Sequence, residues 1–167
     1  MNIYPAYFFK KVRLMKTHAL TLSAVLLASL LFSAFATAAE PVTPKLTEKL
    51  DRLLREEMRS IQSAMGQVHS AIVMGDHATV AKSAQAIHDS FILQQSLTDQ
   101  DKKDLMSAVP EGFIKLDKEF HQLAAELAAA GSKNNTGKQL TIFNEMTQNC
   151  VQCHEEYVSD RFPEISR

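Results

Sequence analysis

The sequence predicts an all-α protein, built as an antiparallel four-helix bundle. Apolar residues recur three and four positions apart over long stretches, and no segment alternates with period two. Short breaks that contain Gly, Asn or Pro separate the stretches, which is typical of helices that fold back on one another. The 167 residues include only five Gly, five Pro and no Trp, and a chain of this length suits one domain.

The first helix is expected from about Leu46 to Met74, where Gly75-Asp76 breaks the pattern. A second helix, capped by Asp76 or Thr79, is expected to follow. The apolar stripe of the first helix contains Met58, Ile61, Met65, Val68 and Ile72, and that of the second contains Val80, Ala84, Ile87 and Phe91.

Residues 97–109 are more polar, and we expect a connection with a short helical turn there. Pro110 suits the first position of a third helix, and residues 131–137 (Gly-Ser-Lys-Asn-Asn-Thr-Gly) predict a loop. The last helix is expected from about Lys138 to Asp160. The third stripe contains Phe113, Leu116, Phe120, Leu123 and Leu127, and the last contains Leu140, Phe143, Thr147, Cys150, His154 and Tyr157.

Residues 1–38 have the pattern of a cleaved signal peptide. They hold four basic residues and no acidic one, then an apolar run from Ala19 to Phe35, then Ala36-Thr37-Ala38 as the cleavage site. Translation from Met15 would still give a complete signal, and an uncleaved anchor is the alternative. We expect residues 39–167 to form a single exported, periplasmic domain with no stable membrane insertion after cleavage.

The charge of the expected mature domain differs from that of the whole chain. Without residues 1–38, 14 Lys and Arg face 19 Asp and Glu, a net charge of −5. No basic stripe is present, so no nucleic-acid partner is expected. The negative charge aids solubility and can steer a basic partner.

Cys150-Val-Gln-Cys153-His154 is the strongest chemical signal in the chain. Two thiols at this spacing can bond the two vinyl groups of one porphyrin, and the following imidazole can bind its iron. On a helix, offsets of three and four residues place all three side chains on one face. The motif predicts one covalent haem c, attached through Cys150 and Cys153 and ligated by His154.

Three other interpretations of the cysteines fit less well. A thioredoxin-like redox site is expected after a strand, and this motif lies deep in a terminal helix. A structural zinc site needs two further ligands at suitable spacing, and the chain has no other cysteine. A disulfide across two intervening residues would strain a helix.

With the expected signal and bundle, this motif near the C-terminus resembles the class II c-type cytochromes, the cytochrome c prime family. The likeness covers residues 45–160 and is most specific from Asn149 to Tyr157. The segment Glu57-Met58-Arg-Ser-Ile61 is similar to the ligand-bearing segment of the low-spin, methionine-ligated subgroup. The resemblance therefore implies that Met58 is the sixth iron ligand.

The order of the helices gives Met58 separate support. In an up-down-up-down bundle the first and last helices are antiparallel, so residues early in the first helix lie near the level of His154. Met65 is seven residues, about 10 Å, further away. His88 is the strongest rival ligand, whereas His69, His77 and His121 are expected at solvated or edge positions.

The iron ligands distinguish the first two of three candidate functions. With Met58 and His154 both on iron, the protein is expected to be an electron carrier with no catalysis of its own and an unidentified redox partner. With Met58 turned away, it would bind nitric oxide or carbon monoxide, as five-coordinate family members do. The third possibility is a haem-free periplasmic stress or chaperone protein. The resemblance also leaves a homodimer open.

Overall fold

The computed structural model describes residues 40–90 and 97–165 of the chain. All regular structure in these residues is helical, so the predicted all-α class is confirmed. A short 3-10 turn, η1 (Thr43–Lys45), precedes the α-helices. These are α2 (Glu48–Met74), α3 (His77–Asp89), α4 (Asp99–Ala108), α5 (Glu111–Ser132) and α6 (Thr136–Tyr157). The predicted signal peptide lies outside the described residues.

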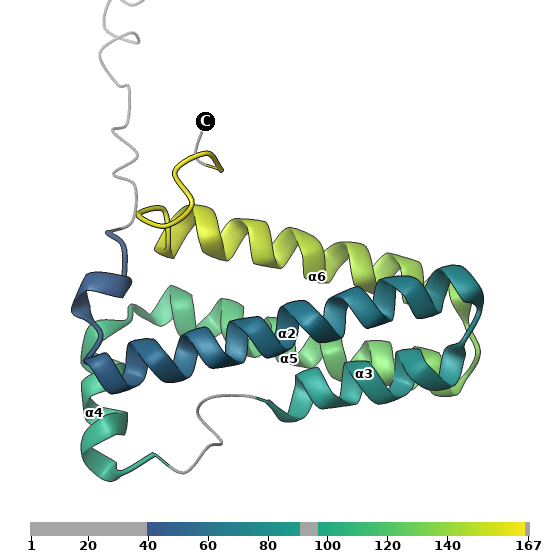
Figure 1. Cartoon of the computed structure of the whole chain (residues 1–167), viewed down its shortest axis with the longest axis horizontal. Coiled ribbons are helices and arrows are strands. Elements are labelled where there is room, and N and C mark those ends of the chain that lie inside the picture. Colours follow the sequence, from purple (N-terminus) through teal and green to yellow (C-terminus); the bar gives the residue numbers. More distant parts are fainter. Residues whose placement is uncertain (1–39, 91–96, 166–167) are drawn as a thin grey trace, which may run out of the picture. The chain divides into compact units, whose positions relative to one another are not determined.

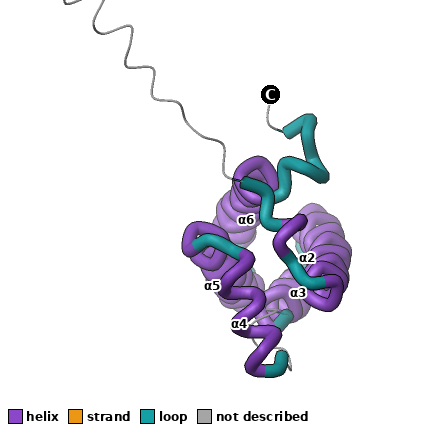
Figure 2. Tube along the Cα trace, turned by 90° about the vertical axis from the view of Figure 1, so that its left-hand side faces the viewer, coloured by secondary structure: helices purple, strands orange, loops and turns teal. Residues whose placement is uncertain are grey.

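Four long helices lie side by side, and the short α4 lies at one end of them (Figure 1). Helices α2 and α5 run in one direction and α3 and α6 in the other (Figure 1). Helix α3 packs closely on both α2 and α5, and α6 packs mainly on α5. The end view in Figure 2 shows the same four helices around a common centre. Contact between α6 and α2 is slight.

Local capping explains where most helices begin and end. The Thr47 side chain accepts a hydrogen bond from the backbone of Leu50 at the start of α2. Gly75 ends that helix in the left-handed conformation, with φ of 71°, which glycine adopts without strain. Of the two predicted caps for α3, Asp76 is the one used, because its carboxylate accepts from the backbone of Thr79.

Residues 97–109 hold a complete helix of ten residues where a short turn was expected. Thr98 and Asp101 form a capping box, in which each side chain accepts from the backbone of the other residue. Leu105 and Ala108 are buried, so α4 contributes to the core. The predicted core residue Phe91 lies outside the described residues.

The connection between α5 and α6 is shorter than the predicted loop over 131–137. Only residues 133–135 separate the two helices, and Asn134 has φ of 51°. Gly131 lies inside α5, where a Cβ atom would stand 2.7 Å from the backbone nitrogen of Ala81. This glycine permits close packing of α3 on α5 and forms no turn. Pro110 is the cap of α5 rather than its first residue.

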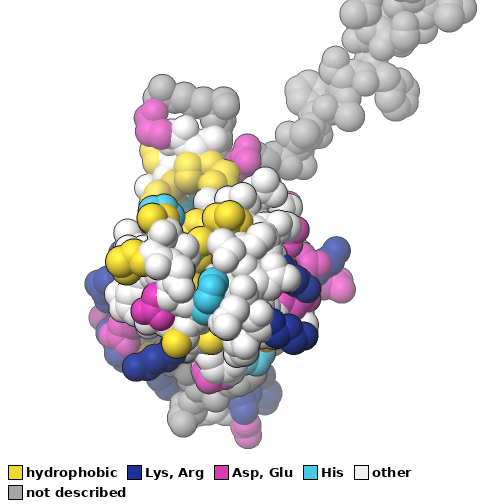
Figure 3. Space-filling model, turned by 90° about the vertical axis from the view of Figure 1, so that its right-hand side faces the viewer, with side chains coloured by type: hydrophobic (Ala, Val, Ile, Leu, Met, Phe, Trp, Pro, Cys, Tyr) yellow, Lys and Arg dark blue, Asp and Glu magenta, His cyan; other side chains and the backbone are white. Residues whose placement is uncertain are grey.

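The buried stripe of α6 differs from the predicted one. Gln139, Ile142, Met146 and Tyr157 are buried, whereas Leu140 is 48% exposed. The buried face of α6 is the one that packs on α5, where the Gln139 amide donates to the Ala130 carbonyl, 3.1 Å away. Figure 3 shows hydrophobic side chains gathered on part of the bundle end where α6 begins and α2 ends.

The apolar core consists of two clusters. The first cluster lies toward the α2–α3 turn and includes Ile61, Val68, Ile87, Phe120, Leu127 and Met146. The second cluster lies toward α4 and includes Val42, Leu50, Leu105, Phe113, Leu116 and Tyr157. None of the helices in the described part of the chain is long and apolar enough to cross a membrane.

Candidate functional site

The three residues of the predicted haem motif lie in the last turns of α6. Cys150, Cys153 and His154 are all partly buried, and both cysteines are free thiols. The helix continues to Tyr157, so the offsets of three and four residues place the three side chains on one face, as predicted. The structure therefore brings this donor set together.

The two thiols contact different clusters of the apolar core. Cys150 packs against the first cluster, and Cys153 packs against the second. The motif thus spans the boundary between the two clusters. A flat apolar group bonded to both sulfurs would contact both clusters, so the chemistry of the surroundings fits a porphyrin.

The electrostatics of the thiols favour the neutral S–H form. Burial raises the pKa of Cys150, and burial followed by the charges of Asp117, Cys150 and Glu156 raises the pKa of Cys153 to about 12. Reactive cysteine pairs of redox enzymes have lowered pKa values, which make thiolates at neutral pH. The observed shift is in the opposite direction, and this argues against a thioredoxin-like role.

The imidazole of His154 is covered on one face by an aromatic ring. The His154 and Phe162 ring centroids are 4.4 Å apart, and the two planes differ by 16°. Burial lowers the pKa of His154, which favours the neutral imidazole. A neutral ring with a free in-plane nitrogen is the form that binds a metal ion.

One ring contact shows which levels of α2 and α6 lie side by side. The ring centroids of His69 and Phe143 are 5.9 Å apart. Met58 lies eleven residues before His69, and His154 lies eleven residues after Phe143. Eleven residues make almost three whole turns, so Met58 shares a stripe with His69, and His154 shares one with Phe143.

Met58 and His154 therefore lie at similar levels along the two antiparallel helices. Both are about 16 Å along the bundle from the ring contact. Helices α2 and α6 diverge from the contact end toward the end where α6 finishes (Figure 1). Met58 is 37% exposed, so its thioether is not part of either core cluster.

The other candidate ligands are placed differently. Nδ1 of His88 lies 3.0 Å from the carbonyl oxygen of His121 and must donate to it. Met65 packs against the first core cluster. His69 is exposed and His77 is partly buried, where it bonds Gln139. The prediction of solvated or edge positions is therefore confirmed for His69 and His77.

His121 was predicted at a solvated or edge position, and this was wrong. It is 4% exposed, and its Nε2 lies 3.7 Å from the Glu57 carboxylate and 3.8 Å from that of Asp117. Its Nδ1 donates to the Ile87 carbonyl, 2.9 Å away. Burial lowers the pKa of His121, and burial raises that of Asp117 to about 6.

This buried polar group was not predicted, because Asp117 and His121 lie beside the apolar stripe of their helix and not on it. A second line on α5, with the same three-four spacing, contains Asp117, His121, Ala124 and Ala128. The small residues on this line, Ala124 and Ala128, allow another helix to pack closely. This pattern was the signal that could have predicted the burial of His121. Glu57, which reaches this group from α2, directly precedes the candidate ligand Met58.

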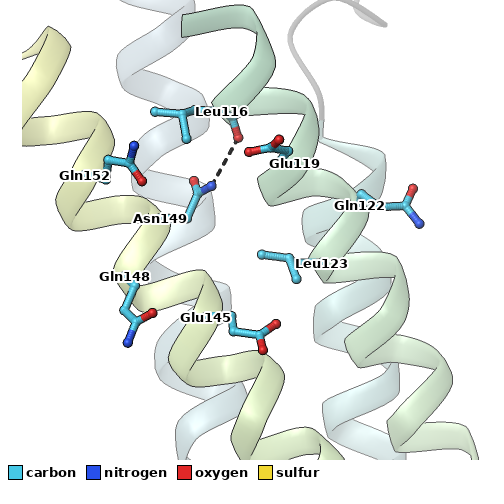
Figure 4. Close-up of a pocket in the computed structure, with 8 residues that line it drawn as sticks. All are labelled: Leu116, Glu119, Gln122, Leu123, Glu145, Gln148, Asn149 and Gln152. Carbon is cyan, nitrogen blue, oxygen red and sulfur yellow. Dashed lines mark hydrogen bonds between the residues drawn. The ribbon is translucent and has the colours of Figure 1, made fainter. Parts of the chain in front are cut away.

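A groove of about 380 Å³ lies between α5 and α6. Figure 4 shows side chains from both helices around it, with the Asn149 amide donating to the Leu116 carbonyl, 3.4 Å away. The remaining lining residues are Glu119, Gln122, Leu123, Glu145, Gln148 and Gln152. The groove touches α6 beside both cysteines but contains none of the three motif side chains.

The chain matches no protein-family model, no curated protein and no solved structure. Within residues 40–90 and 97–165, no group of three or more His, Cys, Asp and Glu side chains is arranged to hold a metal ion by itself.

Proposed function

We propose that the protein is an exported c-type cytochrome that carries electrons. In this proposal Cys150 and Cys153 hold one haem covalently, and His154 and Met58 bind its iron. One observation carries the proposal: a Cys-x-x-Cys-His motif lies at the boundary of two core clusters, with Met58 at the matched level on α2. The motif is the recognised attachment sequence for haem c.

The bound group would supply one-electron chemistry, and the protein would set the conditions for it. A thioether ligand favours ferrous over ferric iron and raises the reduction potential. With His154 on α6 and Met58 on α2 as ligands, no open position would remain on the iron for a substrate or a gas. The two apolar clusters that pack against Cys150 and Cys153 would limit the access of water to a group bonded to both sulfurs. These features suit an electron carrier rather than an enzyme.

The sequence of residues outside the described ranges supports a periplasmic location. Covalent haem attachment takes place after export, and residues 1–38 have the features of a cleaved signal. The net charge of −5 on the remaining chain suits a basic redox partner. The proposed compartment is therefore the periplasm.

A second candidate function is the binding of a diatomic gas at five-coordinate iron. The exposure of Met58 and the divergence of α2 from α6 favour it, since a thioether that stays in solvent would leave the sixth position open. The raised thiol pKa values suit both candidates equally, because each needs the same covalent attachment.

The test is the mass of the chain after export in a host that attaches haem c. We expect the mass of residues 39–167 plus one haem, and a haem stain that survives a denaturing gel. The double variant Cys150→Ala with Cys153→Ala should lose the stain, whereas each single variant should retain one thioether. A wild-type mass equal to the bare polypeptide would overturn the proposal and favour a haem-free helical protein.

A further inference from the structure

We propose that Phe162 is a positioning residue, which holds the imidazole of His154 in one orientation for iron binding. This inference rests on the proposed function, because it concerns the ligand that the proposal assigns to iron. Phe162 lies beyond the end of α6, five residues after Tyr157, in a segment to which the sequence motif assigns no role.

The contact between the two rings leaves the metal-binding atom of His154 free. The rings are nearly parallel, at 16°, with centroids 4.4 Å apart, so Phe162 covers a face of the imidazole. A histidine binds metal through a lone pair in the plane of its ring. Stacking on the face and binding at the edge are therefore compatible, and stacking restricts rotation of the ring.

Phe162 is itself fixed by contacts on both sides of it. The backbone N–H groups of Arg161 and Phe162 both donate to the Val158 carbonyl, at 3.0 and 3.2 Å. The Arg161 guanidinium lies 3.1 Å from the carboxylate of Asp51 on α2. The segment after α6 is thus attached to the early part of α2, beside the position of Phe162.

A second hydrogen bond attaches the same end of α6 to the rest of the bundle. The backbone N–H of Val42 donates to the Tyr157 carbonyl, 2.9 Å away, and both residues belong to the second core cluster. The last turn of α6 is therefore held against the chain that precedes α2. The stack of Phe162 on His154 lies beside this attached end.

His154 needs such support because its ring has no hydrogen bond to another residue in the described ranges. Metal-binding histidines usually donate their second ring nitrogen to a carbonyl or carboxylate, and that bond sets the ring plane. At His154 the stacked Phe162 ring provides the restraint instead. Its removal should let the imidazole adopt several orientations about the iron–nitrogen bond.

The stack is tested first in the haem-free full-length chain, by the proton NMR shifts of the His154 ring. The Phe162 ring current should displace these resonances upfield. Phe162→Leu should abolish the displacement, and Phe162→Tyr, which keeps an aromatic ring, should retain it. Because Phe162 is 41% exposed, neither change should prevent folding. Unchanged His154 shifts in Phe162→Leu would overturn the stack itself.

The positioning role is tested in the matured protein, by electron paramagnetic resonance of the ferric form. We expect sharp low-spin lines in the wild type and in Phe162→Tyr, and broadened lines in Phe162→Leu. Arg161→Gln, which removes the ion pair with Asp51 but keeps the Phe162 ring, should broaden the low-spin lines to a smaller extent. The control is Phe143→Leu, which removes an aromatic ring from α6 that contacts His69 and not His154.

The outcomes separate this inference from the proposed function. If the wild-type chain carries no haem by mass, both are overturned. If it carries haem and the lines of Phe162→Leu stay as sharp as those of the wild type, only the positioning role is overturned.

Discussion

Met58 and His154 occupy matched positions on α2 and α6, each eleven residues from the ring contact between His69 and Phe143. Eleven residues are close to three whole turns, so both residues lie about 16 Å along their helices from that contact. The relationship follows from the His69–Phe143 contact and the rise of the α-helix. It selects Met58 over the other methionine of that stripe, Met65.

Replacement of Met58 should open the sixth position of the iron, and replacement of Met65 should not. In the ferrous matured protein, we expect no carbon monoxide binding for the wild type and about one carbon monoxide per haem for Met58→Leu. The reduction potential of Met58→Leu should fall, because the soft ligand is lost. Visible spectra and titration with the gas measure both effects.

Met65→Leu is the matched control, since it makes the same change seven residues along the same helix. Met65 packs on the first core cluster, and a swap of similar volume there costs less than about 1.5 kcal/mol. Carbon monoxide binding by the wild-type protein would instead support the gas-binding alternative.

The thiols of the haem-free protein should react slowly with alkylating reagents. Burial and nearby negative charge raise the pKa of Cys153 to about 12, and burial raises that of Cys150. At pH 8 the thiolate fraction of Cys153 should be lower by roughly a hundredfold or more than in the unfolded chain. Iodoacetamide labelling followed by peptide mass spectrometry, with and without urea, measures the ratio. Equal rates in both conditions would contradict the burial of this thiol.

The buried carboxyl of Asp117 should make the haem-free protein less stable above pH 6. Its pKa is raised from 3.8 to about 6 by burial, against the opposing charge of Lys118. Neighbouring groups are His121 on its own helix, Glu57 on α2 and Cys153 on α6. A raised carboxyl pKa favours the neutral form, so its stabilising effect is complete below about pH 4 and lost as the pH passes 6.

Asp117→Asn should therefore match the wild type near pH 4 and exceed it by up to about 3 kcal/mol at pH 8. The free energy of unfolding in urea at the two pH values measures the difference. Asp160→Asn, at an exposed position after α6, is the control and should change stability equally at both. A stabilisation by Asp117→Asn that is independent of pH would show that the carboxyl is not buried as described.

Two glycines on the bundle helices should respond to alanine in opposite ways. At Gly131 a Cβ atom would lie 2.7 to 3.0 Å from the backbone and side chain of Ala81, so α3 and α5 must separate. Gly131→Ala should cost about 1–3 kcal/mol. At Gly66 nothing lies within 4 Å, and Gly66→Ala should stabilise α2 by about 0.5–1 kcal/mol. Thermal unfolding of the two variants provides the comparison.

Local signals in the sequence predicted most of the helical framework. The three-four spacing along α2 and the break at Gly75 depend on neighbouring residues only, and the structure begins and ends that helix within two residues of the prediction. The same holds for the motif from Cys150 to His154, since its shared face follows from offsets within one helix. Such features need no knowledge of where other helices lie.

Contacts between distant segments were decided by the tertiary structure. Gly131 resembles a loop residue in sequence, and only its approach to Ala81 shows that it serves helix packing. His121 is buried because α2, α3 and α5 converge on it, and the segment that pairs Arg161 with Asp51 also stacks Phe162 on His154. Periodicity reports which face of a helix is apolar. It does not report which residue of another helix, dozens of positions away, lies opposite that face.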